Sequence, residues 1–219
     1  MQTLQPDADT INPAPASTVI LVRQSRNRPR TLETLLLLRN KRIAFGGTWV
    51  FPGGCVEPDD YRKADGVNHS GGFEGHAGTG EAEANRAFQA AIHAATRETY
   101  EEAGLVLTPE SLFSIAHWTT PAGFTRRFAT WFFLCPVRDP APVRVDRQEI
   151  LDHKWVTPVS ALAEHNAGEL ALSQPTRHTL ETLQRYRNLD ALCEDLLIRN
   201  IHVYPEDCDH YRPVKLRRL

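Results

Sequence analysis

The chain has 219 residues, of which 41% are hydrophobic and 24% charged, a balance typical of one soluble globular domain. Its formal net charge of −2 offers no basic footprint for nucleic acid, so long anionic polymers are not expected as partners. The longest apolar run, Leu35–Leu38, is far too short to span a bilayer. We therefore expect a protein that binds neither nucleic acid nor membrane.

The cysteines and the first residues suggest a compartment. Cys55, Cys135, Cys193 and Cys208 show neither zinc-finger spacing nor the density of a disulfide scaffold. Residues 1–16 lack the basic start and apolar centre of a signal peptide, and we interpret them as a flexible arm. The sequence thus favours a cytoplasmic protein, and it leaves open whether the chain forms a homodimer.

Three short apolar strands are predicted before residue 52. Thr18–Val22 and Thr34–Leu38 flank a polar stretch, Arg23–Arg30, which we interpret as their connecting turn. The third strand, Trp49–Phe51, runs into Pro52 and two glycines. It is therefore expected to end in a backbone turn that no side chain crowds.

The segment from Asp59 to Gly80 is dense in glycine and polar residues, which predicts a flexible loop. A loop of this length inside a compact domain is usually functional or disordered, so it is either a lid over a site or a solvated excursion. The next helix is predicted to begin between Glu81 and Asn85. Its small residues are expected to pack closely on a sheet: Ala87, Ala91, Ala94 and Ala95.

Alternating residues predict a hairpin and a further strand downstream. Ser111–Thr119 and Arg126–Val137 are joined through Pro121-Ala122-Gly123, a turn with suitable chemistry. Glu149–Val156 is the further strand.

Helices are predicted to end the chain. Thr157 followed by Pro158 has the residue types of an N-cap and a first helical position, and it opens a short helix to about His165. Two helices follow, at roughly 175–187 and 190–199, with core leucines at helical spacing: Leu180, Leu183, Leu189, Leu192, Leu196 and Leu197. This order of elements predicts an α/β fold in which helices cover both sides of a mixed sheet.

The nonapeptide 97–105 breaks two local rules of helix stability. At about 100° per residue, Glu98, Glu101 and Glu102 fall on a single helix face, where like charges repel. Gly104 has the residue type of a helix C-cap, which places Glu101 and Glu102 in the last turn, against the negative end of the helix dipole. A solvated acidic helix end is the plain interpretation. The functional one is a site for Mg²⁺ or Mn²⁺, which prefer oxygen ligands.

Together, the glycine turn after Trp49–Phe51 and this acidic helix resemble the signature of the Nudix superfamily. That signature runs Gly, five residues, Glu, seven residues, then Arg-Glu-apolar-any-Glu-Glu-any-Gly-apolar. Gly54 matches the first glycine, and the second half is matched by Arg97, Glu98, Glu101, Glu102, Gly104 and Leu105.

The departures from that signature are specific. Arg97 lies 43 residues after Gly54 instead of fourteen, so 29 extra residues split the motif. Gln89 stands where the family has Glu, and Thr99 where an apolar residue is usual. Such a split resembles the insertion-bearing branch that includes peroxisomal coenzyme A diphosphatases. The segments that carry this second resemblance are Leu35–Arg39, Phe51–Gly54, Ala90–Ile92, Pro121, Arg126–Phe128 and Phe132-Phe133.

The resemblance implies a fold, a domain plan and a reaction. The fold is the Nudix α/β/α sandwich, here with additional C-terminal helices. The domain spans 17–205, with the glycine-rich insertion at about 57–82 and a tail at 206–219. The reaction is metal-dependent cleavage of a diphosphate linkage in a small nucleotide substrate. Coenzyme A or acyl-CoA is the favoured substrate, and ADP-ribose, NADH and dinucleotide polyphosphates are alternatives, as is a ligand-sensing module without turnover.

The resemblance also assigns candidate roles. Glu98, Glu101 and Glu102 hold the metal with a backbone carbonyl at Gly54, and Gly53 leaves room for close approach of the substrate. Arg97 orients the carboxylates by ion pairing.

The identity of the general base stays open between one of these glutamates and Glu149 in a downstream loop. A solvated residue at a strand start is the alternative for Glu149. Arg39, Arg42 and Arg126 are candidate phosphate contacts, each with an exposed charged loop as its alternative.

Overall fold

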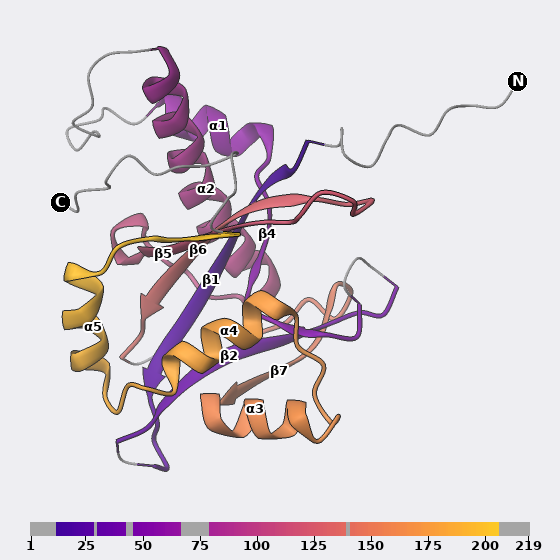
Figure 1. Cartoon of the computed structure of the whole chain (residues 1–219), viewed down its shortest axis with the longest axis vertical. Coiled ribbons are helices and arrows are strands. Elements are labelled where there is room, and N and C mark those ends of the chain that lie inside the picture. The colour runs from indigo at the N-terminus through magenta and orange to yellow at the C-terminus, as the bar shows by residue number, and fades with distance from the viewer. Residues whose placement is uncertain (1–11, 29, 43–45, 67–78, 139–140, 206–219) are drawn as a thin grey trace, which may run out of the picture.

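The structure, a computed structural model, describes residues 12–28, 30–42, 46–66, 79–138 and 141–205. Within these ranges eight strands form a single sheet, with helices on both of its faces (Figure 1). The strands are β1 (Ala14–Gln24), β2 (Leu32–Arg39), β3 (Trp49–Val50), β4 (Gly53–Cys55), β5 (Phe113–Thr119), β6 (Phe128–Pro136), β7 (Ile150–Val156) and β8 (His202–Tyr204). The helices are α1 (Pro58–Asp65), α2 (Thr79–Ala103), α3 (Pro158–Asn166), α4 (Gln174–Leu183) and α5 (Leu189–Ile198), with a 3₁₀ turn at Pro109–Ser111.

The sheet is mixed. Its strand order is β3-β2-β1-β6-β5-β8, with β4 paired to β1 and β7 paired to β2. β1 and β6 run parallel over a long register, from Ala14 opposite Phe128 to Val22 opposite Pro136. β5 and β8 are also parallel, and the other pairs are antiparallel.

The two-residue period of the strands divides the core into two layers. From β1, Ile20 and Val22 face one side of the sheet, and Val19 and Leu21 face the other. The first side packs against leucines of α4 and α5 and the second against alanines of α2, whose small side chains allow close approach to the sheet. The predicted α/β fold with helices on both faces is therefore confirmed.

Several local predictions differ from the structure. The predicted loop from Asp59 contains helix α1, because the Asp60 carboxylate accepts the backbone N–H of Glu57 at the helix start and Pro58 occupies the first helical position. α2 begins at Thr79, two residues before the predicted range of starts. Residues 67–78, the rest of the predicted lid, lie outside the described residues.

Two further differences lie elsewhere in the chain. β1 begins at Ala14, inside the predicted N-terminal arm, because β4 and β6 supply hydrogen-bonding partners there. Leu197 is exposed rather than in the core, since it lies on the outer face of α5.

No helix of the described ranges is long and apolar enough to cross a membrane.

Candidate functional site

The Pro-Gly-Gly turn is held against the C-terminal end of α2. β4 pairs with β1 through Thr18 opposite Gly53 and Ser17 opposite Gly54, which fixes the turn on the sheet. The backbone N–H of Gly53 donates a 2.9 Å hydrogen bond to Oε2 of Glu102. The structure therefore joins the two halves of the split signature directly.

Gly54 lies against a second helix carboxylate. A Cβ built on Gly54 would fall 2.5 Å from Cδ and 2.7 Å from Oε2 of Glu98, which is closer than real Cβ atoms approach other atoms. Only glycine therefore leaves the Glu98 carboxylate where it is. Gly53 is constrained differently, because its Cβ would fall 2.7 Å from Cα of Thr18 in the neighbouring strand.

Arg97 connects the acidic side chains of the site. Its Nη1 donates to Oε1 of Glu98 at 2.9 Å and to Oε2 of Glu101 at 3.0 Å. Its Nη2 donates to Oδ2 of Asp60 at 2.9 Å and to the carbonyl oxygen of Cys55 at 3.0 Å. One guanidinium thus ties α2 to α1 and to β4. Burial alone would lower the pKa of Arg97, but the hydrogen bond to Asp60 and the charge of Glu98 outweigh it and raise that pKa.

Asp60 is a member of this network that the sequence pattern did not reveal. It is fully buried, and besides Arg97 its carboxylate accepts the backbone N–H of Glu57. The Glu57-Pro58-Asp59-Asp60 stretch carried a recognisable helix-start signal, which the glycines that follow obscured. The pairing with Arg97, 37 residues away, had no local signal.

Glu102 is the most buried of the three helix glutamates, with 5% exposure. Desolvation raises its pKa to about 8, assisted by the negative charges of Glu98 and Glu149 and opposed by the Gly53 hydrogen bond and by Arg39. Desolvation also raises the pKa of Glu98, although Arg97 opposes the rise. Glu101 differs from both, since its side chain is largely exposed.

The local signals at the end of α2 behave as the sequence suggested. Gly104 has φ +67, and its N–H donates to the carbonyl of Tyr100 at 2.8 Å, so it is the left-handed residue that ends the helix. Thr99, which stands where the signature has an apolar residue, is fully buried. Its hydroxyl donates to the Ala95 carbonyl at 2.8 Å, which satisfies the polar group within the helix.

Glu149 lies in a loop that hydrogen bonds organise tightly. The carboxylate of Asp146 accepts the backbone N–H groups of Glu149 and Ile150, each at 2.9 Å. The Glu149 carbonyl accepts the N–H of Asn40 at 2.8 Å, which fixes this loop beside the end of β2. The Glu149 side chain is exposed, and its charge reaches Glu102.

The arginines predicted to contact phosphate are placed unequally. Arg39 lies with Nη1 3.6 Å from Oε1 of Glu102, and its buried Nε has no hydrogen-bond partner among the described residues. Cys55 directly follows the glycine turn, and burial raises the pKa of its thiol, assisted by the charge of Glu98. The positive charges of Arg126 and Arg39 oppose this rise, which means that both arginines lie near the glycine turn. Within the described ranges the structure shows no contact between the exposed Arg42 side chain and the site, and the Arg42 backbone N–H donates to Oδ1 of Asn40.

The chemistry of the donor set fits a hard divalent cation, although the side chains do not yet converge on one. Among the described residues, no three His, Cys, Asp or Glu side chains stand at metal-binding distances. Glu98 and Glu101 are drawn to Arg97, and Glu102 to Gly53. Carboxylate oxygens are nevertheless the ligands that Mg²⁺ and Mn²⁺ prefer. Glu98 and Glu102 are largely buried, and their raised pKa values reflect poor solvation of their carboxylates.

Comparisons with known proteins bear on the fold of the chain and on its relatives. No family model matches the chain. The human protein acyl-coenzyme A diphosphatase NUDT19 is 35% identical over 94 residues, covering 41% of this chain and 25% of that protein. A Caenorhabditis elegans protein named as nudix hydrolase 7 is 26% identical over 176 residues, covering 75% of this chain and 59% of its own. The chain therefore covers 25% of the length of the first relative and 59% of the length of the second.

A solved structure of similar architecture is the NUDIX hydrolase from Alicyclobacillus acidocaldarius. It superposes with a TM-score of 0.67 over 84% of this chain and 97% of its own, at 22% identity. At that identity the likeness establishes the fold.

Proposed function

Because the chain has the Nudix fold and sequence relatives among the Nudix hydrolases, we propose that it hydrolyses a diphosphate linkage in a small nucleotide substrate with the help of Mg²⁺ or Mn²⁺. One observation carries the proposal. The Gly53-Gly54 turn meets Glu98 and Glu102 directly, although the two halves of the site are separated by a long insertion. The full set of helix carboxylates argues against a fold kept only for ligand sensing.

Glu98, Glu101, Glu102 and the Gly54 carbonyl would hold the ion. The ion would supply neutralisation of charge on the phosphoryl oxygens and an acidified water. Arg97 is a positioning residue in this proposal, since it grips Glu98 and Glu101 from one side and Asp60 from the other. It thereby limits the rotations open to the two glutamates.

Three residues at the edge of the site would handle the substrate and the proton. Arg39 and Arg126 lie near the glycine turn, where guanidinium groups suit phosphate oxygens. Glu149, on the loop fixed by Asp146, would accept a proton from the attacking water. The water oxygen then bonds to one phosphorus while that phosphorus loses its bond to the bridging oxygen, which leaves with the other phosphate.

Coenzyme A or an acyl-CoA is the substrate that we favour. Arg39, Lys41 and Arg42 form a positive stretch beside the site on a chain of formal net charge −2, which suits a ligand with a phosphate beyond the scissile pair. Coenzyme A carries that phosphate on its ribose. The name of the human relative, acyl-coenzyme A diphosphatase, favours the same substrate. The products would be a phosphopantetheine and adenosine 3′,5′-bisphosphate.

The test is product formation across a panel of diphosphates, with Mg²⁺ or Mn²⁺ and with chelator. The panel holds CoA, acetyl-CoA, dephospho-CoA, ADP-ribose, NADH and a dinucleotide polyphosphate. A charge-assisted contact to the extra phosphate is worth roughly 1.5–3 kcal/mol, so dephospho-CoA should lose about ten- to a hundredfold in kcat/KM. Faster turnover of ADP-ribose than of CoA would overturn the substrate assignment.

The Glu101→Gln variant tests the metal site itself. Its fold should be unaffected because the side chain is largely exposed, while metal-dependent turnover of every substrate should be lost. Activity within a few-fold of the wild type would contradict the metal-site assignment. Binding of CoA without turnover, in the presence of metal, would indicate a sensing module instead.

A further inference from the structure

A pocket of about 190 Å³ lies far from the glycine turn, at the opposite end of β2. Leu32, which opens β2, lines this pocket, whereas Arg39, which closes the strand, lies at the candidate active site. At about 3.3 Å per residue, the strand separates the two places by roughly 20 Å. The pocket therefore belongs to a different part of the molecule.

Two chain segments that meet at this pocket are basic. The segment 24–31, which joins β1 to β2, contains three arginines and no carboxylate. The segment 182–189, which joins α4 to α5, contains Arg185 and Arg187 and again no carboxylate. On a chain with a formal net charge of −2, this concentration of positive charge is local.

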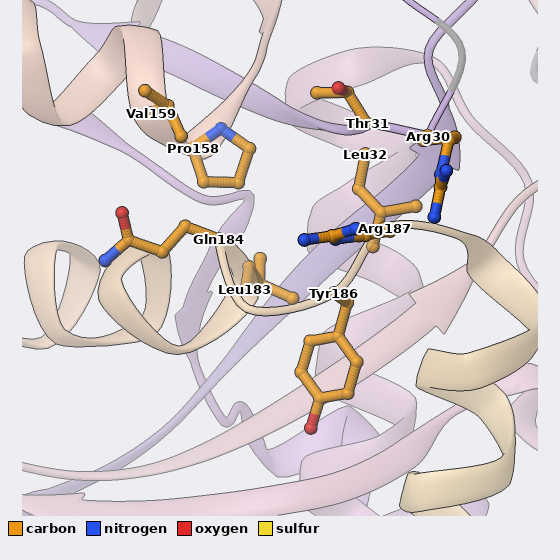
Figure 2. A pocket seen from close by; sticks show the side chains of 9 residues that line it. All are labelled: Arg30, Thr31, Leu32, Pro158, Val159, Leu183, Gln184, Tyr186 and Arg187. Atoms are coloured by element: carbon orange, nitrogen blue, oxygen red, sulfur yellow. The ribbon is translucent and has the colours of Figure 1, made fainter.

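The pocket combines this charge with an apolar floor. Leu32, Pro158 and Leu183 are buried side chains that line it, and Arg30 and Arg187 stand at its rim. Figure 2 shows the two arginines on one side of the pocket, with Pro158 and Val159 on the other. The Tyr186 ring points away from them, and its hydroxyl donates to Asp195 on α5.

Neither rim arginine has an ion-pair or hydrogen-bond partner for its guanidinium among the residues that the structure describes. Arg30 also has φ +66, in the left-handed region that side chains with a Cβ rarely occupy. Backbone strain of this kind persists where the surrounding structure enforces it, and it often marks a ligand site. Here it holds a guanidinium at the mouth of an apolar pocket.

We propose that this pocket is a second binding site, which takes a small organic anion. A phosphate or carboxylate head would lie between Arg30 and Arg187, and an apolar body would rest on Leu32, Pro158 and Leu183. The volume favours a small molecule over a polymer, because a few ring atoms fill it. The site is independent of the proposed hydrolysis, since it shares no residue with the glycine turn or the helix glutamates.

Phenyl phosphate is a suitable probe, because it has the required head and body and contains no diphosphate linkage. Calorimetric titration of the full chain without metal should give saturable binding of one probe per chain. Arg187→Gln should weaken binding about tenfold or more, as expected for the loss of a charge-assisted contact. The matched control is Arg185→Gln, an exposed arginine of the same segment that does not line the pocket, and its affinity should match the wild type.

Arg30→Gly separates binding from folding. Glycine accepts the positive φ, so the variant should melt within a few degrees of the wild type and yet lose probe affinity about tenfold. Arg39→Gln, which alters the other anion site, should leave probe binding unchanged. The proposal is overturned if phenyl phosphate shows no saturable binding, or if Arg39→Gln rather than Arg187→Gln abolishes binding. It is also overturned if the protein binds vesicles of acidic lipid through these arginines but does not bind phenyl phosphate.

Discussion

Arg97 and Asp60 form an ion pair that joins helix α2 to helix α1 inside the insertion. Nη2 of Arg97 lies 2.9 Å from Oδ2 of Asp60, and the Asp60 side chain is fully buried. The same guanidinium holds Glu98 and Glu101, so Arg97 connects Asp60 of the insertion to the candidate metal ligands. The insertion that separates the two halves of the signature in the sequence thus helps to position the glutamates of its second half.

The first prediction follows from this pair. Asp60→Asn removes a fully buried carboxylate that pairs with the partly buried guanidinium of Arg97 and places an amide donor against other donors, so the free energy of unfolding should fall by about 3 kcal/mol. Denaturant unfolding measures this change. The matched control is Asp65→Asn, which removes an ion pair to Arg86 on the exposed face of the same two helices and should have a far smaller effect. Equal losses in the two variants would show that Asp60 has no special role.

Asp60 also shows where the sequence stops being informative. The strands β1, β2, β6 and β7 and the capped end of α2 follow from periodicity and from Gly104, which are local signals. Helix α1 has a local signal too, but eight residues beside a glycine-rich stretch are easily assigned to the loop. β8 has three residues and forms only by parallel pairing with β5, so no local pattern specifies it.

The candidate site shows the same division. The spacing of Glu98, Glu101 and Glu102 along a helix is local, and this spacing alone predicts that they share one face. The contacts of Glu102 with Gly53, and of Arg97 with Asp60, cross 49 and 37 residues. Such pairings depend on how the insertion folds back, and a single sequence does not specify this.

The second prediction concerns the pH dependence of stability without metal. Burial raises the pKa of Glu102 from 4.5 to about 8, so the folded protein holds this proton more tightly than the unfolded chain does. The proton on Glu102 therefore adds to the free energy of unfolding. This contribution is complete below about pH 4.5, declines as the pH rises toward about 8, and is absent above that value.

The thermal midpoint of wild-type protein in chelator should therefore fall relative to that of Glu102→Gln as the pH rises through this window. Glu110→Gln, at an exposed position, is the control and should track the wild type. Added Mg²⁺ should oppose the decline at the upper end, because the ion favours the ionised carboxylate. A constant difference between wild type and Glu102→Gln at all pH values would contradict the burial argument.

The third prediction contrasts the two glycines of the turn. In Gly54→Ala the three atoms nearest the new Cβ all belong to the end of the flexible Glu98 side chain, which can move aside. The fold should survive, while metal affinity and turnover fall because Glu98 is displaced. In Gly53→Ala the Cβ meets backbone atoms of β1, which cannot move without disturbing the sheet, so stability should fall instead. Calorimetric metal titration and thermal melts of both variants distinguish these outcomes, and a reversed pattern would contradict the geometry.

The last prediction concerns Glu149 as the base. Its loop is held by Asp146 and Asn40, so replacing its side chain with an amide of the same shape should leave the backbone in place. Glu149→Gln should then lower kcat by about 10²–10⁴-fold, as expected for loss of a general base, with little change in metal affinity. Asp152→Asn, at an exposed position on β7, serves as the charge-matched control and should retain full activity. The distinguishing measurement is kcat together with calorimetric metal affinity, because a residue that binds metal would change both. If kcat is unaltered in Glu149→Gln, the role of base returns to the glutamates of α2.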